Sequence, residues 1–233
     1  MTMNEHATMT DYSAGYGLSA QERNKVLRNT YGLLALSMVP TVLGAWMGVE
    51  FGLGQIFSGG LGLVLSLAGI FGFIYAIEKT KNSAMGVPVL LGFTFFMGLM
   101  LSRMIGHTLG FSNGPQLIMT AFGGTAGVFF VMASLASVIK RDLSGMGQWL
   151  FVGMIVLLVG SVINMFVGSS TGMVVISMVA IGIFSAYMLY DIKRIIDGGE
   201  TNYISATLAL YLDIVNVFQS LLALLGIFGG ERD

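Results

Sequence analysis

The sequence lacks cysteine altogether and contains only two histidines. Without cysteine the chain can form no disulfide, no thiolate metal site and no cysteine nucleophile. The histidines, His6 and His107, lie outside the interiors of the long apolar segments, so a histidine metal site is not expected either. A net charge of −1 argues against a nucleic-acid partner.

Charge is also scarce, and this excludes an ordinary soluble domain. Charged residues make up 10% of the chain and hydrophobic residues 55%, whereas soluble domains are about 25% charged. Most of the surface is therefore expected to face lipid. Glycine is abundant, at 33 of 233 residues. Because small residues let membrane helices approach closely, we expect Gly98, Gly123 and Gly127 to be helix-packing contacts.

Seven apolar segments have the length of about 20 residues that crosses a bilayer. They fall near residues 27–48, 60–78, 87–106, 115–138, 147–168, 171–192 and 203–229. Glycine, serine, asparagine and proline separate them, as in turns, and no long stretch alternates polar and apolar residues as a membrane barrel would. The sequence thus predicts an all-α, polytopic membrane protein with seven transmembrane helices.

The first 25 residues are polar and lack the basic start and apolar core of a secretory signal. We interpret residues 1–25 as a cytosolic N-terminal tail and residues 26–233 as one seven-helix membrane domain. The pattern Ser19-Ala20-Gln21-Glu22 matches a capping box and predicts the start of the first helix.

Basic residues mark one side of the membrane. The tail and the even-numbered loops hold 9 of the 11 lysines and arginines, and the odd-numbered loops hold none. Because cytosolic loops are enriched in lysine and arginine, the N-terminus is expected in the cytosol and, after seven crossings, the C-terminus on the periplasmic or extracellular side.

Two aspartates lie within the last two apolar segments. Asp191 is near the end of the sixth, and Asp213 is inside the seventh. A carboxylate in a membrane span costs a few kcal/mol and is a functional candidate by default. Both aspartates lie toward the cytosolic boundary, so contact between them is compatible with their depths, although spacing alone leaves it open.

Span seven also carries a stripe of small and polar residues. Its members recur at spacings of four and three: Asn202, Ala206, Ala209, Asp213, Asn216, Ser220 and Ala223. Such a stripe on an apolar helix faces protein or water rather than lipid. We therefore expect the seventh helix to be central, with Asp213 pointing inward. A packing seam without further function is the alternative.

Two adjacent carboxyl groups share a proton, because both cannot ionise cheaply, and they titrate as one unit. With the proton they would latch spans six and seven together, and without it they would repel each other and attract cations. Calcium prefers six to eight oxygen ligands. Asp191, Asp213 and the Asn216 amide oxygen would offer it a weak site, suited to passage rather than storage.

The run 190–204, continued by 210–218, closely resembles the Bax inhibitor/YccA family, also called the transmembrane BAX-inhibitor-motif family. Residues 25–31 and 123–130 are similar to its bacterial YccA branch. The resemblance spans nearly the whole chain. It implies seven helices with the last one wrapped by the others, in the bacterial inner membrane, and a pH-sensitive calcium leak with Asp191 and Asp213 as its paired aspartates.

The resemblance also implies two further features. Some members carry an arginine near the end of span two that pairs with the first aspartate. Residues 76–81 contain no arginine here, and Lys79 is the nearest substitute as a latch partner. The YccA branch also resembles a modulator of the membrane-embedded FtsH protease, so FtsH is a possible partner and the polar tail would matter most for that role.

Two other classes fit less well. An intramembrane aspartyl protease also has a Tyr-Asp pair, as in Tyr190-Asp191, but its second aspartate follows Gly-x-Gly, whereas Asp213 follows Leu210-Tyr211-Leu212. A retinal protein needs a lysine in its last span, and span seven has none. We therefore predict no catalytic residue and no enzyme activity, and no cofactor beyond calcium as the permeant ion.

Overall fold

The structure is a computed structural model, and it describes residues 19–231. This part of the chain forms seven long α-helices and one short 3₁₀ helix, with no strand. They are α1 (Ala20–Glu50), η1 (Leu53–Phe57), α2 (Gly59–Thr80), α3 (Gly86–Leu109), α4 (Gly114–Val138), α5 (Met146–Val167), α6 (Ser170–Ile196) and α7 (Tyr203–Gly229). Each α-helix is long and apolar enough to cross a membrane, which confirms the predicted fold class.

Most helix ends agree with the predicted spans to within about three residues. However, α1 begins at Ala20 rather than at residue 27, and α6 ends at Ile196 rather than at residue 192. The predicted capping box is present: the Ser19 hydroxyl accepts from the Glu22 backbone N–H at 3.2 Å, and the Glu22 carboxylate accepts from the Ser19 N–H at 2.8 Å. Residues 20–25 of the expected tail are therefore helical, and residues 1–18 lie outside the described part.

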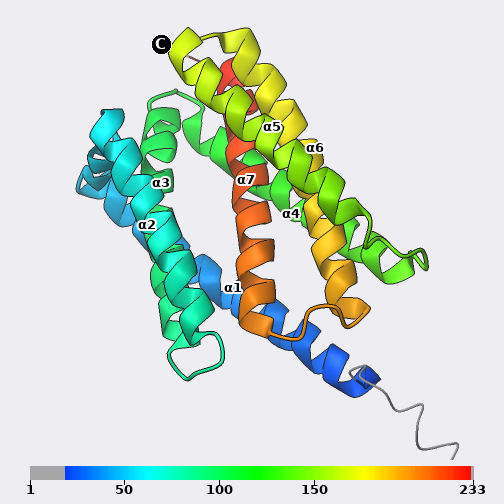
Figure 1. Cartoon of the computed structure of the whole chain (residues 1–233). Coiled ribbons are helices and arrows are strands. Elements are labelled where there is room, and N and C mark those ends of the chain that lie inside the picture. Colours follow the sequence, from blue (N-terminus) through cyan, green and yellow to red (C-terminus); the bar gives the residue numbers. More distant parts are fainter. Residues whose placement is uncertain (1–18, 232–233) are drawn as a thin grey trace, which may run out of the picture.

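The seventh helix is central, as predicted. Figure 1 shows α7 between α2 and α3 on one side and α4, α5 and α6 on the other, with α1 crossing close to its start. In the described residues α7 packs against α1, α2, α3, α4 and α6. An apolar helix so enclosed buries side chains on several faces, and nine residues of α7 are fully buried.

Glycines bring α1 and α3 into close contact. Gly98 lies directly on the Thr41 backbone, and Gly44 lies on the Phe95 carbonyl, so a Cβ at either glycine would collide with the other helix. The expectation for Gly98 is confirmed. The expectation for Gly123 and Gly127 is wrong, because a Cβ at either position would meet open space on the outer side of α4.

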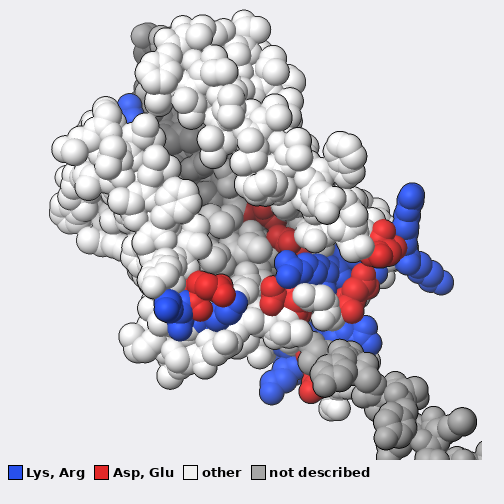
Figure 2. Space-filling view, in the orientation of Figure 1, with Lys and Arg blue, Asp and Glu red and all other residues white. Residues whose placement is uncertain are grey.

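Charged side chains gather at one end of the molecule. Figure 2 shows most lysine, arginine, aspartate and glutamate atoms around the beginning of α1 and of α7, while the rest of the visible surface is almost uncharged. Large apolar side chains such as Phe71, Phe130 and Phe166 are exposed along the helices. This distribution is what a bilayer-embedded bundle with one strongly charged boundary requires.

Candidate ion-conducting site

Helices α6 and α7 bring the two predicted aspartates together. The helices are antiparallel neighbours joined by a short turn in which Gly198 adopts a positive φ of 82°. The Asn202 side chain starts α7 by accepting hydrogen bonds from the Ile204 and Ser205 N–H groups. The turn thus fixes how the end of α6 meets the beginning of α7, where Asp191 and Asp213 lie.

The carboxyl groups of Asp191 and Asp213 lie close enough to interact electrostatically and, with one proton between them, to form a hydrogen bond. Asp213 is 5% exposed, so it points inward as expected, and Asp191 is half-buried. The Oδ2 atom of Asp213 has no hydrogen-bond partner among the described residues. A hydrogen bond between two carboxyl groups needs one proton, and losing it leaves two like charges in contact.

The neighbouring charges come from α6 and from the turn after it. Arg194, three residues beyond Asp191 on the same helix, acts electrostatically on that carboxyl group. Its guanidinium also lies 3.7 Å from the Glu200 carboxylate and donates to the Gly199 carbonyl at 3.3 Å. Buried Lys193 is paired with Asp197 at 2.5 Å. Arg194 therefore acts on Asp191 while its guanidinium also contacts Glu200 and Gly199.

The predicted latch partner, Lys79, is not brought to Asp191. Its ammonium lies 5.5 Å from the centre of the Tyr75 ring, in an exposed position on α2. In the described structure α2 makes no contact with α6. The prediction assumed that residues at one membrane depth meet, whereas the packing separates these two helices. Arg194 is the cation that acts on Asp191 instead.

Asn216 lies one turn beyond Asp213 on α7. Its side-chain amide donates to the Leu212 carbonyl at 2.8 Å, which leaves its own carbonyl oxygen available as an acceptor. Among the described residues no group of three or more histidine, aspartate or glutamate side chains is placed to hold a metal. The carboxylate pair with Asn216 therefore supplies only a few of the oxygens that calcium prefers.

A buried hydroxyl cluster next to the pair was not predicted. Tyr211, fully buried on α7, bonds the Thr41 hydroxyl at 2.8 Å and donates to the Thr94 carbonyl at 3.3 Å. It thereby links α7 to α1 and α3. The signal available in the sequence was a tyrosine two residues before Asp213, because a buried phenol needs a hydrogen-bond partner.

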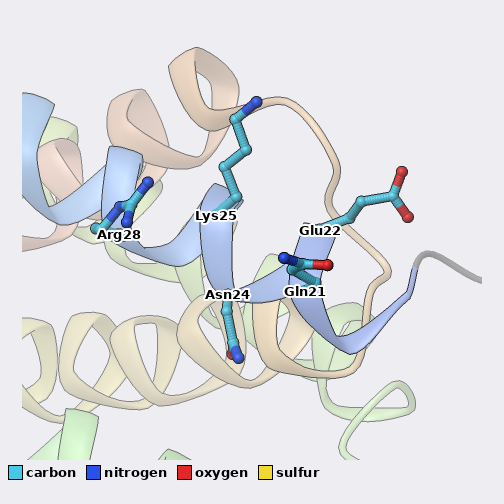
Figure 3. A pocket seen from close by; sticks show the side chains of 5 residues that line it. All are labelled: Gln21, Glu22, Asn24, Lys25 and Arg28. Carbon is cyan, nitrogen blue, oxygen red and sulfur yellow. The ribbon is translucent and has the colours of Figure 1, made fainter.

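One recess in the surface lies at the beginning of α1, at the charged end of the molecule. Figure 3 shows its lining side chains, which come from the first three turns of α1: Gln21, Glu22, Asn24, Lys25 and Arg28. They are all polar and point away from the helix in different directions. This part of α1 therefore offers a water-facing surface rather than a lipid-facing one.

The loop between α4 and α5 holds an exposed carboxylate whose two oxygens both accept hydrogen bonds, in contrast to Asp213. Exposed Asp142 accepts the Ser144 N–H at 2.8 Å and the Ser144 hydroxyl at 2.9 Å. These hydrogen bonds, with a smaller contribution from Lys193, lower the pKa of Asp142 below its ordinary value. Asp142 is therefore charged at neutral pH and fully partnered, unlike Asp213.

The chain is similar in sequence to known membrane proteins. The profile of the family described as "Inhibitor of apoptosis-promoting Bax1" matches residues 23–230. An uncharacterized membrane protein of Vibrio cholerae is 40% identical over 210 residues, covering 90% of this chain and 92% of that protein. Two Escherichia coli proteins are each 37% identical over 203 residues, which cover 87% of this chain and 90% of each relative. They are "Modulator of FtsH protease YccA" of strain K12 and "Inner membrane protein YccA" of strain CFT073.

Proposed function

Because the chain belongs to the Bax inhibitor family, we propose that it is a pH-sensitive calcium leak of the bacterial inner membrane, gated by the proton that Asp191 and Asp213 share. One observation supports the proposal: two carboxyl groups from adjacent membrane helices interact with each other at close range, and one of them is nearly inaccessible. An ionisable residue inside a membrane span is a functional candidate by default.

Proton loss would act on both packing and ion attraction. With the proton present, the hydrogen bond holds α6 against α7. Without it, like-charge repulsion favours separation of the helices at this level, and the two carboxylates attract a divalent cation. Asp191, Asp213 and the Asn216 carbonyl oxygen would contact the ion, with water completing its shell. Flux is therefore expected to rise with pH between about 6 and 8.

The decisive experiment measures calcium flux into reconstituted liposomes across a pH series. Asp191→Asn and Asp213→Asn each keep the side-chain shape but remove one titrating group. Each single variant should lose the pH dependence of calcium flux that the wild type shows. The double variant should differ little from the single variants, because one titrating unit has already been broken. Unchanged midpoints in the single variants would contradict the shared-proton gate, whatever the absolute rates.

Asp142→Asn is the matched control. It removes one carboxylate from the loop that joins α4 to α5, where Asp142 is exposed and bonded only locally. A midpoint that stays in place in this variant shows that the effect of the other two comes from the pair and not from the loss of any one negative charge.

We further propose that the charged end of the bundle is cytosolic and that α7 ends on the periplasmic side, since nearly all lysines and arginines lie at the charged end. A reporter fused after Asp233 should then be periplasmic, and one inserted at Lys140 should be cytosolic. A cytosolic C-terminal reporter would overturn this orientation.

The second candidate function is modulation of an FtsH-type protease. It is favoured by the 37% identical E. coli relative that is named as such a modulator. The polar recess of α1, lined by Gln21, Asn24 and Lys25 among others, is a surface that a membrane-anchored partner could contact from the cytosolic side. Co-purification of FtsH that is lost on replacing these side chains by alanine, in a protein with no calcium flux, would favour this role over the leak.

A further inference from the structure

The buried residues of α7 leave one face of the helix open. At 100° per residue, the nine buried residues cover the sides toward α6, α4, α1 and α3. The remaining face contains no fully buried residue. Its members recur at spacings of four and three and are all half-buried: Ser205, Ala209, Leu212, Asn216, Gln219 and Ala223.

This open face borders a hollow. The contacts of Tyr211 with α1 and α3, of Asp213 with α6 and of Leu221 with Gly124 on α4 account for the other directions around the helix. Figure 2 shows a hollow in the direction that remains, between the α2–α3 side and the α5–α6 side of the molecule. Half-buried side chains are what the wall of such a hollow would contain.

Contacts bound the hollow at one end, and the helices beside it diverge toward the other end. At the charged end the Asn202 amide donates to the Lys81 carbonyl at 3.1 Å and to the Asn82 side chain at 2.8 Å, which ties the start of α7 to the loop after α2. From there α2 and α7 diverge toward the end of α7 (Figure 1). The wider end therefore lies on the side of the membrane at which α7 ends.

The polar groups along the wider part lack protein partners. Gln219 and Ser220 form no side-chain hydrogen bond with any described residue, and Asn216 uses only its NH₂ group, toward Leu212. Elsewhere in the spans hydroxyls such as those of Ser37 and Thr125 bond to the carbonyl one turn earlier. An unpaired amide in hydrocarbon costs several kcal/mol, so lipid tails are a poor occupant for this part of the hollow.

We infer that the hollow is a water-filled vestibule that leads from the end of α7 down to Asp213, along Asn216, Gln219 and Ser220. Ser220 lies seven residues beyond Asp213, which corresponds to about 10 Å along the helix. Within this stretch a hydrated cation reaches the carboxylate pair without crossing hydrocarbon. This inference rests on the proposed leak for its purpose, since it supplies the route to that site, but not for its test.

The absence of cysteine makes the test direct, because every introduced thiol is the only one in the chain. Cysteine replaces Gln219 or Ser220 at the test positions. The water-facing control is Glu231→Cys, at an exposed, charged position just beyond the end of α7. The lipid-facing control is Ile163→Cys, at a position 57% exposed on α5. Leu222→Cys, at a position only 1% exposed, is the buried control. A membrane-impermeant, positively charged methanethiosulfonate reagent is added to the full-length protein in vesicles, on the side where α7 ends.

Thiols at positions 219 and 220 should react at rates within about tenfold of the thiol at position 231, because a thiol in water forms the reactive thiolate. The lipid-facing and buried thiols should react at least about tenfold more slowly than the test thiols, since each unit of pKa increase lowers the thiolate fraction tenfold. Rates at both test positions as low as those at 163 and 222 would overturn the vestibule. A variant is used only if size-exclusion chromatography shows a single folded species. If one test variant fails this criterion, Asn216→Cys replaces it.

A flux measurement on the labelled protein separates this inference from the proposed function. If the leak exists, a fixed positive charge at position 219 should reduce calcium flux severalfold, while labelling at position 231 should leave it unchanged. Fast labelling at 219 and 220 in a protein without calcium flux would retain the vestibule and contradict the leak. Slow labelling with intact flux would contradict the vestibule and retain the leak.

Discussion

The face of α7 that packs on α1 and α3 differs from the face that packs on α6 in how its polar atoms are bonded. On the first face the Tyr211 hydroxyl has two partners, and the Thr207 hydroxyl donates to the Tyr203 carbonyl at 2.7 Å and lies 3.3 Å from the Thr30 carbonyl. On the second face the Oδ2 atom of Asp213 has no partner among the described residues. We call the first set, Thr30, Thr41, Thr94, Thr207 and Tyr211, the hydroxyl seam.

The two faces of α7 are therefore expected to differ in role: the fully bonded face stabilises the fold, and the face with Asp213 responds to pH. A buried polar group with all its hydrogen bonds stabilises one arrangement, whereas a buried group that lacks a partner makes the arrangement sensitive to whatever can supply one. In this protein the possible suppliers are a proton, a cation or Arg194. We therefore expect substitutions at the seam and at the α1–α3 contact to change stability, and substitutions at the aspartates to change the response to pH.

The largest loss of stability is expected from Gly98→Ala. The added Cβ would collide with the Thr41 backbone, and overpacking of this kind costs about 1–3 kcal/mol. Gly127→Ala is the matched control, because its Cβ enters open space and alanine is favoured over glycine in a helix by about 0.5–1 kcal/mol. Unfolding in detergent by heat or denaturant measures both. Equal effects would mean that α1 and α3 do not pack as closely as described.

A smaller loss is expected from Tyr211→Phe, which removes only the hydroxyl. The net contribution of such a hydrogen bond is about 0.5–1.5 kcal/mol, and Thr41 still donates to the Ser37 carbonyl in the variant. Tyr75→Phe, at an exposed position, controls for the chemical change. The pH midpoint of flux should not move. A shifted midpoint would show that the seam and the aspartate pair form one coupled network.

Apolar length and helix capping made most of the fold predictable from the sequence. The seven spans, the capping box at Ser19 and the central position of α7 follow from local patterns that need no knowledge of the partner helices. The same holds for the inward orientation of Asp213, because a carboxylate in a span has no favourable alternative.

The predictions that were wrong concern which helices and side chains contact each other. Lys79 has the expected depth but lies on a helix that does not contact α6, and Gly127 has the expected residue type but faces outward. The stripe on span seven was predicted as one inward face, yet only Ala206 and Asp213 of its members are fully buried, and Asn216 lies on the open face. Azimuthal position around a helix depends on tertiary packing, which a single sequence does not contain. Gln219 was available as a signal, since a glutamine inside a span requires a polar environment.

Asp213→Asn should change stability less than Gly98→Ala or Tyr211→Phe, by about 0.5 kcal/mol or less. The amide keeps the shape of the side chain and donates to Asp191, so the contact survives without a shared proton. Unfolding measured in parallel with flux would test the division between the two faces. A loss of stability larger than that of Tyr211→Phe would mean that the pair is mainly a structural bond and would weaken the argument for a gate.

The smallest effect is expected from Asp142→Asn, and its dependence on pH can be stated from the local hydrogen bonds. Because the Ser144 N–H and hydroxyl lower the pKa of Asp142 in the folded protein, ionisation of this carboxyl group favours folding at pH values above about 4, the ordinary value for an unfolded chain. The contribution is lost as the pH falls through the folded-state pKa. The difference in unfolding between wild type and variant should therefore be present at pH 7 and disappear in acid. Ser144→Ala, which removes the hydroxyl but keeps the N–H, should show part of the same pH-dependent difference. A difference that persists in acid would show that Asp142 contributes by something other than its charge, and it would then no longer serve as the fully partnered, ionised counterpart of Asp213.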